Sequence, residues 1–536
     1  MEKMNKNLIC RISLAAALCL CLSLPLFAAE ADKKILRYGA VNQKSTLDMQ
    51  LNTYSRVMDI SDAIVEPLLR IDEENRLIPV LLDETPKPSK DGRTYRFKLK
   101  PGIKFHDGTT LKASDVQYTF ERMFKPSTEA VATYICDMIV GAQDMLEGNS
   151  EDLKGFKVID DLTFEITLDF PYSPFLNAIA TSYAGIYSRK ACEAAGKDWG
   201  LVTYIGTGPF KVTKMDLDNG VVTERFEDYH GDKQPLDGIE FIFIEDPNTR
   251  RMEYESGNID IMTLDAMLYP EYSKSRLAPE IGSYAPIGII FVDPNVKSEF
   301  LGDVRVREAV SLAIDRRALA DDLMKGTAIE ARSFLPKGMV GYDDKVAPYK
   351  RDVERARKLL ADAGYPNGIE VESYIRNTAM NEMTGRILLA VQNQLAEAGI
   401  NIRVIQVDPA TMSDMRSNGA VPFEVFDWYA DFPDPDGFLY SMLYSVNAEQ
   451  LTSNYRSAEF DKLLDDARAT ADAEKRAELY KKADNMATRV DYAAIPLFHE
   501  KLYFLAKPYV KNFKMVYNDV FHFYGVDIDL AARKKK

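Results

Sequence analysis

A short aromatic and acidic segment late in the chain is the clearest candidate for chemistry. Trp428, Tyr429 and Asp431 stand close together in the sequence. They follow the apolar pair Val425-Phe426, where we expect a strand to end. An ionised carboxylate only accepts hydrogen bonds, so Asp431 could hold a cationic group, such as an ammonium, that has left water. Alternatively, Asp431 only begins a turn, because two prolines follow it closely.

Metal and enzyme chemistry find no support in the sequence. The four histidines are too far apart to form a metal-ligand motif. The chain has no nucleophile elbow, no zinc-protease helix signature and no phosphate-binding glycine loop. Acidic pairs such as Asp465-Asp466 fall on predicted helix faces, where solvated charge is the default explanation. We therefore expect no cofactor, no metal and no catalysis, with a secreted hydrolase as the enzyme alternative.

Length and charge limit the class of protein. At 536 residues the chain exceeds the roughly 250–300 residues over which one hydrophobic core keeps growing, so at least two domains are expected. Apolar residues make up 46% and charged residues 28%, as in soluble proteins. The formal net charge of −15 disfavours nucleic acid as a partner, because phosphate binding depends on a basic surface.

Residues 1–31 have the pattern of a cleaved export signal. Lys3, Lys6 and Arg11 form a basic start, and residues 12–27 form an apolar run. Ala29-Glu30-Ala31 then satisfies the small-x-small rule for cleavage. A membrane anchor is the alternative, but a spanning helix needs about 20 apolar residues and this run is shorter. We therefore predict a mature protein that begins near residue 32.

The cysteines leave one question open. Cys19 and Cys21 lie in the apolar run and could mark a lipoprotein, but each follows a leucine where lipoprotein signals prefer a small residue. The mature chain keeps Cys136 and Cys192. An oxidising compartment would allow these two to pair, and two buried free thiols are the alternative.

The elements that would position a site alternate between helix and strand. Residues 352–363 and 383–398 read as amphipathic helices, each stopped by a glycine, and residues 400–404 alternate as a strand. Helices that feed strands in this way indicate α/β layers with a partly parallel sheet. Nearer the start, residues 95–99 predict a strand, Pro101-Gly102 a turn and residues 103–105 a second short strand. A helix capped by Ser114 is expected to follow.

Six segments resemble, in order, the landmarks of one known family. RTYRFKLKPGIKFHDGTTLKASDVQYTFERM at 93–123 closely resembles the signature of the family 5 extracellular solute-binding proteins, the dipeptide, oligopeptide and nickel binders of ABC importers. The other five are GTGPF at 206–210, DPNTRRMEYESGNIDI at 246–261, DVRVREAVSLAIDRRAL at 303–319, KLLADAGYPNG at 358–368 and ADFPDPDGFL at 430–439. Any one of them would be weak support, but six in register span nearly the whole mature chain.

The resemblance implies a fold. It is the α/β, two-lobed periplasmic-binding-protein fold, type II and cluster C-like, with two strands crossing the hinge. Lobe I is expected at residues 32–286 and again at 495–536, with an extra subdomain inserted at about 71–195. Lobe II is expected at residues 287–494.

The resemblance also implies roles for particular residues. Peptide binders of the family have a W-x-A-D segment whose aspartate receives the peptide α-ammonium group, which would be Asp431 here, beside Trp428 and Tyr429. They place an arginine in lobe II that clamps the α-carboxylate. Arg376 resembles it in position, and its guanidinium fork suits the task, although an ordinary surface arginine is the alternative. Tyr134 resembles a lobe I residue that packs over the ligand, and core packing is its alternative role.

The function implied is that of the periplasmic substrate-binding component of an ABC transporter. Such a protein captures a short peptide between its lobes, delivers it to permease subunits in the inner membrane, and is expected to be a monomer. A nickel chelate, an opine or a short oligosaccharide is the alternative ligand within the family.

Overall fold

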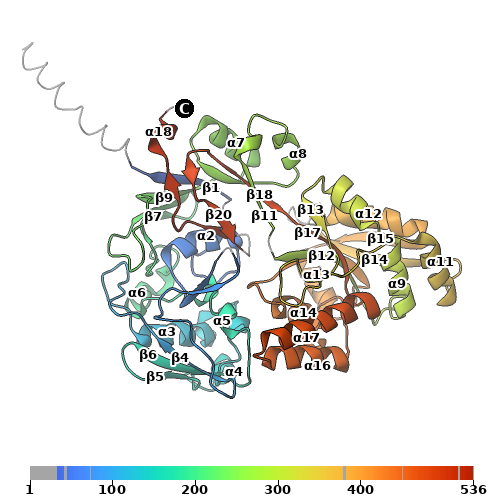
Figure 1. The fold of residues 1–536 in the computed structure, drawn as a ribbon, viewed down its shortest axis with the longest axis horizontal. Coiled ribbons are helices and arrows are strands. Elements are labelled where there is room, and N and C mark those ends of the chain that lie inside the picture. The colour runs from blue at the N-terminus through green and yellow to red at the C-terminus, as the bar shows by residue number, and fades with distance from the viewer. Residues whose placement is uncertain are drawn as a thin grey trace, which may run out of the picture.

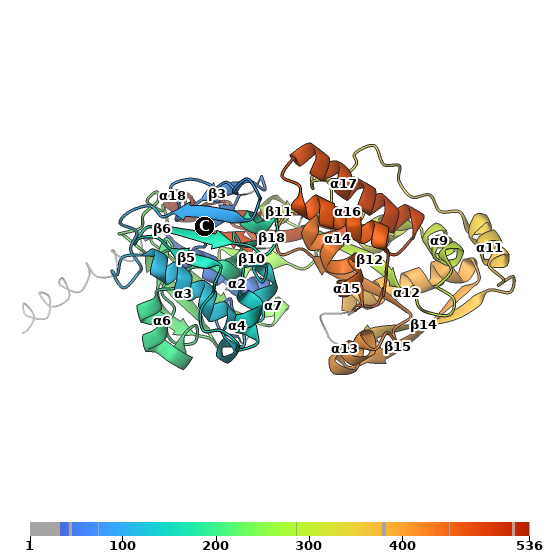
Figure 2. The same ribbon diagram turned by 90° about the horizontal axis from the view of Figure 1, so that it is seen from below.

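The computed structural model of the protein describes residues 33–41, 45–72, 74–285, 287–377, 382–449, 451–516 and 520–534. The predicted export signal and its cleavage site lie outside these residues. Two α/β lobes lie side by side (Figures 1 and 2), as predicted. None of the helices in the described part of the chain combines the length and the apolar character that a membrane crossing requires.

Lobe I is built on a seven-stranded sheet of order β11-β18-β10-β1-β9-β8-β7. Its central strand β1 buries Leu36 and every residue from Tyr38 to Ala40, and it runs parallel to both β9 and β10. The strands are β1 (Ile35–Ala40), β7 (Phe210–Asp216), β8 (Gly220–Arg225), β9 (Gly238–Phe243), β10 (Ile261–Leu264), β11 (Ile281–Tyr284) and β18 (Leu502–Ala506). The longer helices of this part are α2 (Ser55–Ile64) and α7 (Pro247–Ser256).

A smaller sheet of order β4-β6-β5 lies at one end of lobe I, within the region where the inserted subdomain is expected. Phe97 of β4 stacks on Phe164 of β6, with ring centroids 4.9 Å apart, which joins the two strands on their buried face. The elements of this region are β2 (Leu69–Ile71), β3 (Leu77–Pro79), β4 (Thr94–Lys98), α3 (Ala113–Phe124), α4 (Ala142–Leu146), β5 (Phe156–Val158), β6 (Thr163–Thr167), α5 (Phe175–Ala178) and α6 (Arg189–Ala195).

Two local predictions in this region are wrong. Residues 103–105 form no strand: Lys104 makes only an isolated bridge to Thr110. The helix begins at Ala113 and its N-cap is Lys112, not Ser114. The side chain of Asp115 accepts the Lys112 backbone N–H at 3.0 Å, so an acidic residue in the first turn takes the capping role.

Lobe II contains a four-stranded sheet of order β13-β17-β12-β16 and a parallel pair β14-β15. The parallel pair confirms the predicted partly parallel layering. The strands are β12 (Gly288–Pro294), β13 (Ala328–Glu330), β14 (Ile369–Arg376), β15 (Ile400–Val407), β16 (Phe423–Tyr429) and β17 (Ile495–Glu500). The longer helices are α9 (Val304–Ala313), α11 (Val353–Asp362), α12 (Glu382–Glu397), α13 (Pro409–Ser417), α14 (Asp436–Leu443), α16 (Ala458–Ala469) and α17 (Ala473–Asn485).

The chain crosses between the lobes in two neighbouring strands. β11 pairs antiparallel with β18 in lobe I, and β12 pairs antiparallel with β17 in lobe II. Each crossing strand therefore has the other as its partner on both sides of the joint, and Figure 1 labels all four strands there. The exact limits of the lobes stay a prediction. We keep the first limit between β11 and β12, and we move the return to lobe I from residue 495 to the joint between β17 and β18, because β17 (Ile495–Glu500) pairs with β12 and β13 of lobe II.

The hydrophobic core continues from lobe I into one part of lobe II. One cluster of buried residues includes Phe175 of lobe I together with Phe438, Leu464 and Tyr480 from α14, α16 and α17. A second cluster packs α9, α11 and α12 against the sheets of lobe II. Cys136 and Cys192 are both buried and free, which answers the question that the sequence left open.

Candidate functional site

Asp431 of lobe II lies where the two lobes meet. It follows β16 by two residues, and the backbone N–H of Ala430 donates to the Ile287 carbonyl at 3.1 Å, which fixes the chain just before it. Two hydroxyl groups of lobe I hold its carboxylate. Tyr134 donates to Oδ2 at 2.8 Å and Tyr183 donates to Oδ1 at 3.2 Å. These bonds reach the other lobe instead of Asp431's own turn, so the carboxylate faces the joint.

The charge of Asp431 has no cationic partner in the described part of the chain. No lysine, arginine or histidine there forms an ion pair with it. Burial raises the pKa of the carboxyl group, and the hydrogen bonds from Tyr134 and Tyr183 lower it in part. A buried carboxylate supported only by neutral hydroxyls would gain from a cation that enters the joint.

A hollow of about 560 Å³ opens on one side of Asp431. Both lobes contribute to its walls, which are rich in aromatic rings: Tyr134, Phe170, Tyr172, Trp428, Phe432 and Tyr440. Asp137 and Asp169 also line it, and burial together with the nearby Asp169 charge raises the pKa of Asp137 to about 6, against the pull of Arg468. The hollow therefore combines aromatic rings with several carboxylates and the cation Arg468, and it is large enough for a small ligand.

An ion-pair cluster in the wall of this hollow ties the lobes together. Arg468 of α16 lies 3.0 Å from the Asp436 carboxylate, and its guanidinium lies 3.6 Å from the centroid of the Tyr440 ring. From lobe I, Tyr172 donates to Asp436 at 2.8 Å and the Ser173 backbone N–H donates to the Arg468 carbonyl at 2.8 Å. The hollow thus contains one cation that is already paired, Arg468 with Asp436, and the carboxylate of Asp431, which has no cationic partner among the described residues.

The other predicted site residues fall in different places. Trp428 lines the large hollow and donates its Nε1–H to the Gly437 carbonyl at 2.7 Å. Tyr429 pairs with Gly288 in the sheet, and its hydroxyl bonds to Glu500 at the crossing. Arg376 is the last residue of β14, and no hydrogen bond or ion pair of the described residues joins it to Asp431. The structure therefore brings together Trp428, Asp431 and Tyr134, and not Arg376.

A second, tighter hollow lies on the lobe I side of Asp431. It holds about 10 Å³, and Asp62, Arg70, Tyr183, Asp431 and His522 are among the residues that line it. All of these polar groups except Asp431 were missed by sequence reasoning, and Tyr183 lies in residues 182–184 while the other three lie on regular elements. These three come from α2, β2 and β21 (Val520–His522), far apart in the chain, so no local signal could have found them.

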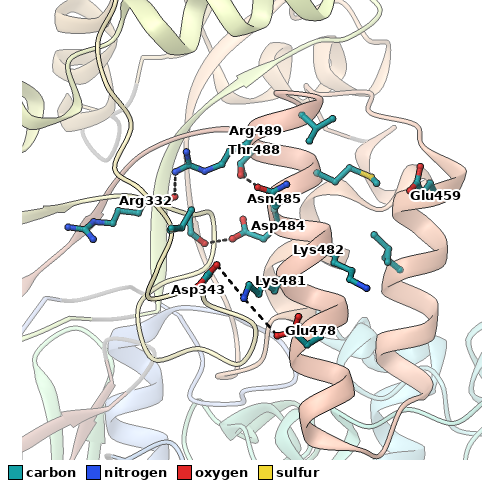
Figure 3. Close-up of a pocket in the computed structure, with 15 residues that line it drawn as sticks. Arg332, Asp343, Glu459, Glu478, Lys481, Lys482, Asp484, Asn485, Thr488 and Arg489 are labelled. Atoms are coloured by element: carbon teal, nitrogen blue, oxygen red, sulfur yellow. Dashed lines mark hydrogen bonds and ion pairs between the residues drawn. The ribbon is translucent and has the colours of Figure 1, made fainter.

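Another pocket is lined by residues of lobe II alone (Figure 3). It measures about 410 Å³ and lies between residues 332–346 and the helices α16 and α17. Several of its charged groups have partners of their own. Lys481 lies 3.3 Å from Asp343, and the buried carboxylate of Asp484 accepts hydrogen bonds from the Ser333 hydroxyl and the Phe334 backbone N–H. These pairings indicate a structural role.

Comparison with known proteins agrees with this architecture. The profile of the bacterial extracellular solute-binding proteins, family 5 Middle, matches residues 76–450, more than half of the chain. The chain belongs to this family. Heme-binding protein A of Haemophilus influenzae is 27% identical over 491 residues, 88% of this chain and 87% of its own. The dipeptide-binding protein of Escherichia coli is 27% identical over 524 residues, 94% of this chain and 96% of its own.

Solved structures of the same fold match almost the whole of this solute-binding protein. HbpA2 from Haemophilus parasuis superposes with a TM-score of 0.80 at 24% identity, covering 92% of this chain and 100% of its own. The periplasmic binding protein DppA from Helicobacter pylori, in complex with the peptide STSA, superposes with a TM-score of 0.75 at 23% identity, covering 92% and 98%. These likenesses confirm the two-lobed fold.

Proposed function

We propose that the protein captures a short peptide between its lobes and delivers it to the permease of an ABC importer. The observation that carries the proposal is the Asp431 carboxylate, which lies at the joint and has no cationic partner among the described residues. A peptide α-ammonium group is a cation of the right size for this position. Charge-assisted hydrogen bonds to a carboxylate are among the stronger ones in proteins.

The walls of the large hollow suit the rest of a peptide. Trp428 and Tyr134 offer aromatic faces from lobe II and lobe I, and both line the same hollow as Asp431. Tyr429 would support Trp428 from its place in β16. Arg376, the residue that the family resemblance suggested for the α-carboxylate, lines neither hollow that Asp431 lines.

The transport role follows from the family and from the joint. A ligand that touches both lobes stabilises the closed arrangement, because only a ligand with differential affinity for the two states can shift their balance. We expect the protein to work in the periplasm after removal of residues 1–31, as a monomer, without turnover of its ligand. The similarity to a dipeptide-binding protein and to a structure holding a peptide supports the peptide class.

The experiment begins with a defined pool of unmodified dipeptides, tripeptides and tetrapeptides. Protein freed of ligand is incubated with the pool, and mass spectrometry identifies what stays bound. Calorimetry then measures the tightest peptide with and without N-acetylation, on the wild type and on Asp431→Ala. We expect each single change to weaken binding strongly and the two together to add little more, because both remove the same interaction.

Other results would contradict the proposal. If no peptide of the pool binds, or if the losses are additive, Asp431 does not hold an ammonium group. Heme is the informative competitor, since one similar protein is named for it and heme carries carboxylates but no ammonium. Stoichiometric heme binding that Asp431→Ala leaves intact would favour a heme-type solute, and release of a peptide product would favour a hydrolase.

A further inference from the structure

We infer that Arg70 of lobe I binds the carboxylate of the ligand, so that the two charged ends of a peptide are divided between the lobes. This inference rests on the proposed function and deepens it, because it names the group that the opposite wall would recognise. It concerns a residue outside the segment that sequence reasoning singled out.

Arg70 is a half-buried cation without an acceptor. It lies on β2, and its guanidinium lies 4.0 Å from the centroid of the Tyr524 ring. No carboxylate or carbonyl of the described residues accepts a hydrogen bond from it or forms an ion pair with it. A guanidinium carries five N–H donors in a planar fork that matches a carboxylate. Leaving such donors unused in a partly buried place is costly, so the site favours an anion from outside the chain.

The nearby acidic groups do not fill this role. Glu66 accepts hydrogen bonds from the Tyr229 hydroxyl at 2.7 Å and from the Thr207 hydroxyl at 2.9 Å. Asp62 is only 7% exposed, and its Oδ2 lies 3.7 Å from His522 Nε2 without a hydrogen bond. Both carboxylates lend Arg70 a favourable potential without occupying its donors.

Arg70 and Asp431 face the same hollow from opposite lobes. Tyr183 lines this hollow as well and donates its hydroxyl to Asp431. The hollow holds about 10 Å³, roughly the space of one water molecule. A ligand can enter only when the lobes part, and it can then replace Tyr183 as the link between them.

Closure of the lobes is explained better if the residues that bind the two charged ends of the peptide lie on different lobes than if both lie on lobe II. If Asp431 and Arg376 held both ends, neither charged contact would itself join lobe II to lobe I. A carboxylate on Arg70 and an ammonium on Asp431 are satisfied together only when the lobes meet. The differential affinity that closure needs then comes from the two strongest contacts.

The test uses the tightest peptide of the pool, as the free acid and as the C-terminal amide. Calorimetry measures both on the full mature chain of the wild type, Arg70→Ala, Arg70→Lys and the matched variant Arg376→Ala. We expect amidation to weaken wild-type binding by about 30-fold or more, and Arg70→Ala to do the same. Amidation should then cost Arg70→Ala almost nothing further, whereas Arg376→Ala should behave like the wild type.

Arg70→Lys guards against a purely structural effect. Lysine keeps the charge and loses the planar fork, so we expect it to bind the free acid with an intermediate loss while its melting temperature stays close to that of the wild type. Additive losses for Arg70, coupling of amidation to Arg376, or equal affinity for acid and amide in the wild type would each overturn the inference. The N-acetylation test on Asp431→Ala distinguishes the two proposals. If N-acetylation and Asp431→Ala remove the same interaction while the Arg70 test fails, the inference about Arg70 is wrong and the proposed function still holds.

Discussion

Two buried carboxylates in this protein differ in where their partners come from. Asp431 accepts hydrogen bonds from Tyr134 and Tyr183, which belong to the other lobe. Asp484 accepts them from the Ser333 hydroxyl and the Phe334 backbone N–H, which belong to its own lobe. Burial raises the pKa of both carboxyl groups.

The difference indicates which carboxylate can exchange its partners. The donors of Asp484 lie in the same body of the protein, beside the pocket of Figure 3, and movement of the lobes leaves them in place. The donors of Asp431 separate from it when the lobes part. A group whose partners leave during a functional motion is free to accept a ligand, whereas one whose partners stay is part of the framework.

The largest expected difference between the two carboxylates is in their effect on the affinity for peptide. Asp431→Ala should weaken peptide binding by about two to three and a half orders of magnitude, because removing one member of a buried ion pair costs about 3–5 kcal/mol. Asp484→Ala should leave the dissociation constant within about twofold of the wild type. Calorimetry with the same peptide measures both, and equal losses would remove the distinction between the two sites.

For the free energy of unfolding we expect the reverse order, with the larger loss in Asp484→Ala and the smaller loss in Asp431→Ala. Asp484→Ala leaves the Ser333 hydroxyl and the Phe334 N–H without an acceptor, which costs about 1–3 kcal/mol of unfolding free energy. Asp484→Asn keeps an acceptor at the same place and serves as the matched control with a smaller loss. Urea unfolding without ligand gives these values. A larger loss in Asp431→Ala than in Asp484→Ala would contradict the framework role of Asp484.

The pH dependence of stability separates the two Asp484 variants further. Burial raises the pKa of Asp484 from 3.8 to about 6, so between these values the native state binds more protons than the unfolded chain. The unfolding free energy of the wild type should therefore fall as pH rises from about 4 through 6. In Asp484→Asn this contribution is absent, and the difference between unfolding curves at pH 4.5 and 7 should shrink.

A smaller effect is expected on the pH dependence of binding. An ammonium ligand needs the ionised form of Asp431, so affinity should fall as pH falls through the pKa of that carboxyl group. Tyr183→Phe removes a hydrogen bond that lowers this pKa. The fall in affinity should then begin at a higher pH than in the wild type. Titration calorimetry between pH 5 and 8 checks this, and coinciding curves would show that Tyr183 does not tune Asp431.

The part of the site that lies within one short segment, residues 428–431, could be predicted from the local sequence. Trp428 and Asp431 could be predicted because a strand end, two aromatic residues and a carboxylate follow one another within a few positions. Arg70, Asp62 and His522 could not, because only the three-dimensional fold brings α2, β2 and β21 to one hollow. Arg376 had a suitable residue type and a loose family position, and neither determines which residues it faces.

The errors in the predicted fold have a similar origin. Ile103 and Phe105 are both buried, which produces the alternation of a strand. Their backbone groups instead close a tight turn, with Phe105 N–H bonded to Thr109 O and Leu111 N–H bonded to Ile103 O. Alternating burial indicates which side chains face the core, and it does not determine how many ladder bonds a segment makes.

The central claim is that a ligand joins lobe II to lobe I across the hinge formed by β11–β12 and β17–β18. Small-angle scattering of the mature protein, freed of ligand and then saturated with the tightest peptide, tests it most directly. The account predicts a lower radius of gyration with the free peptide, and little change with its N-acetylated or amidated form at equal concentration. An unchanged radius of gyration with a peptide that calorimetry proves to be bound would contradict it.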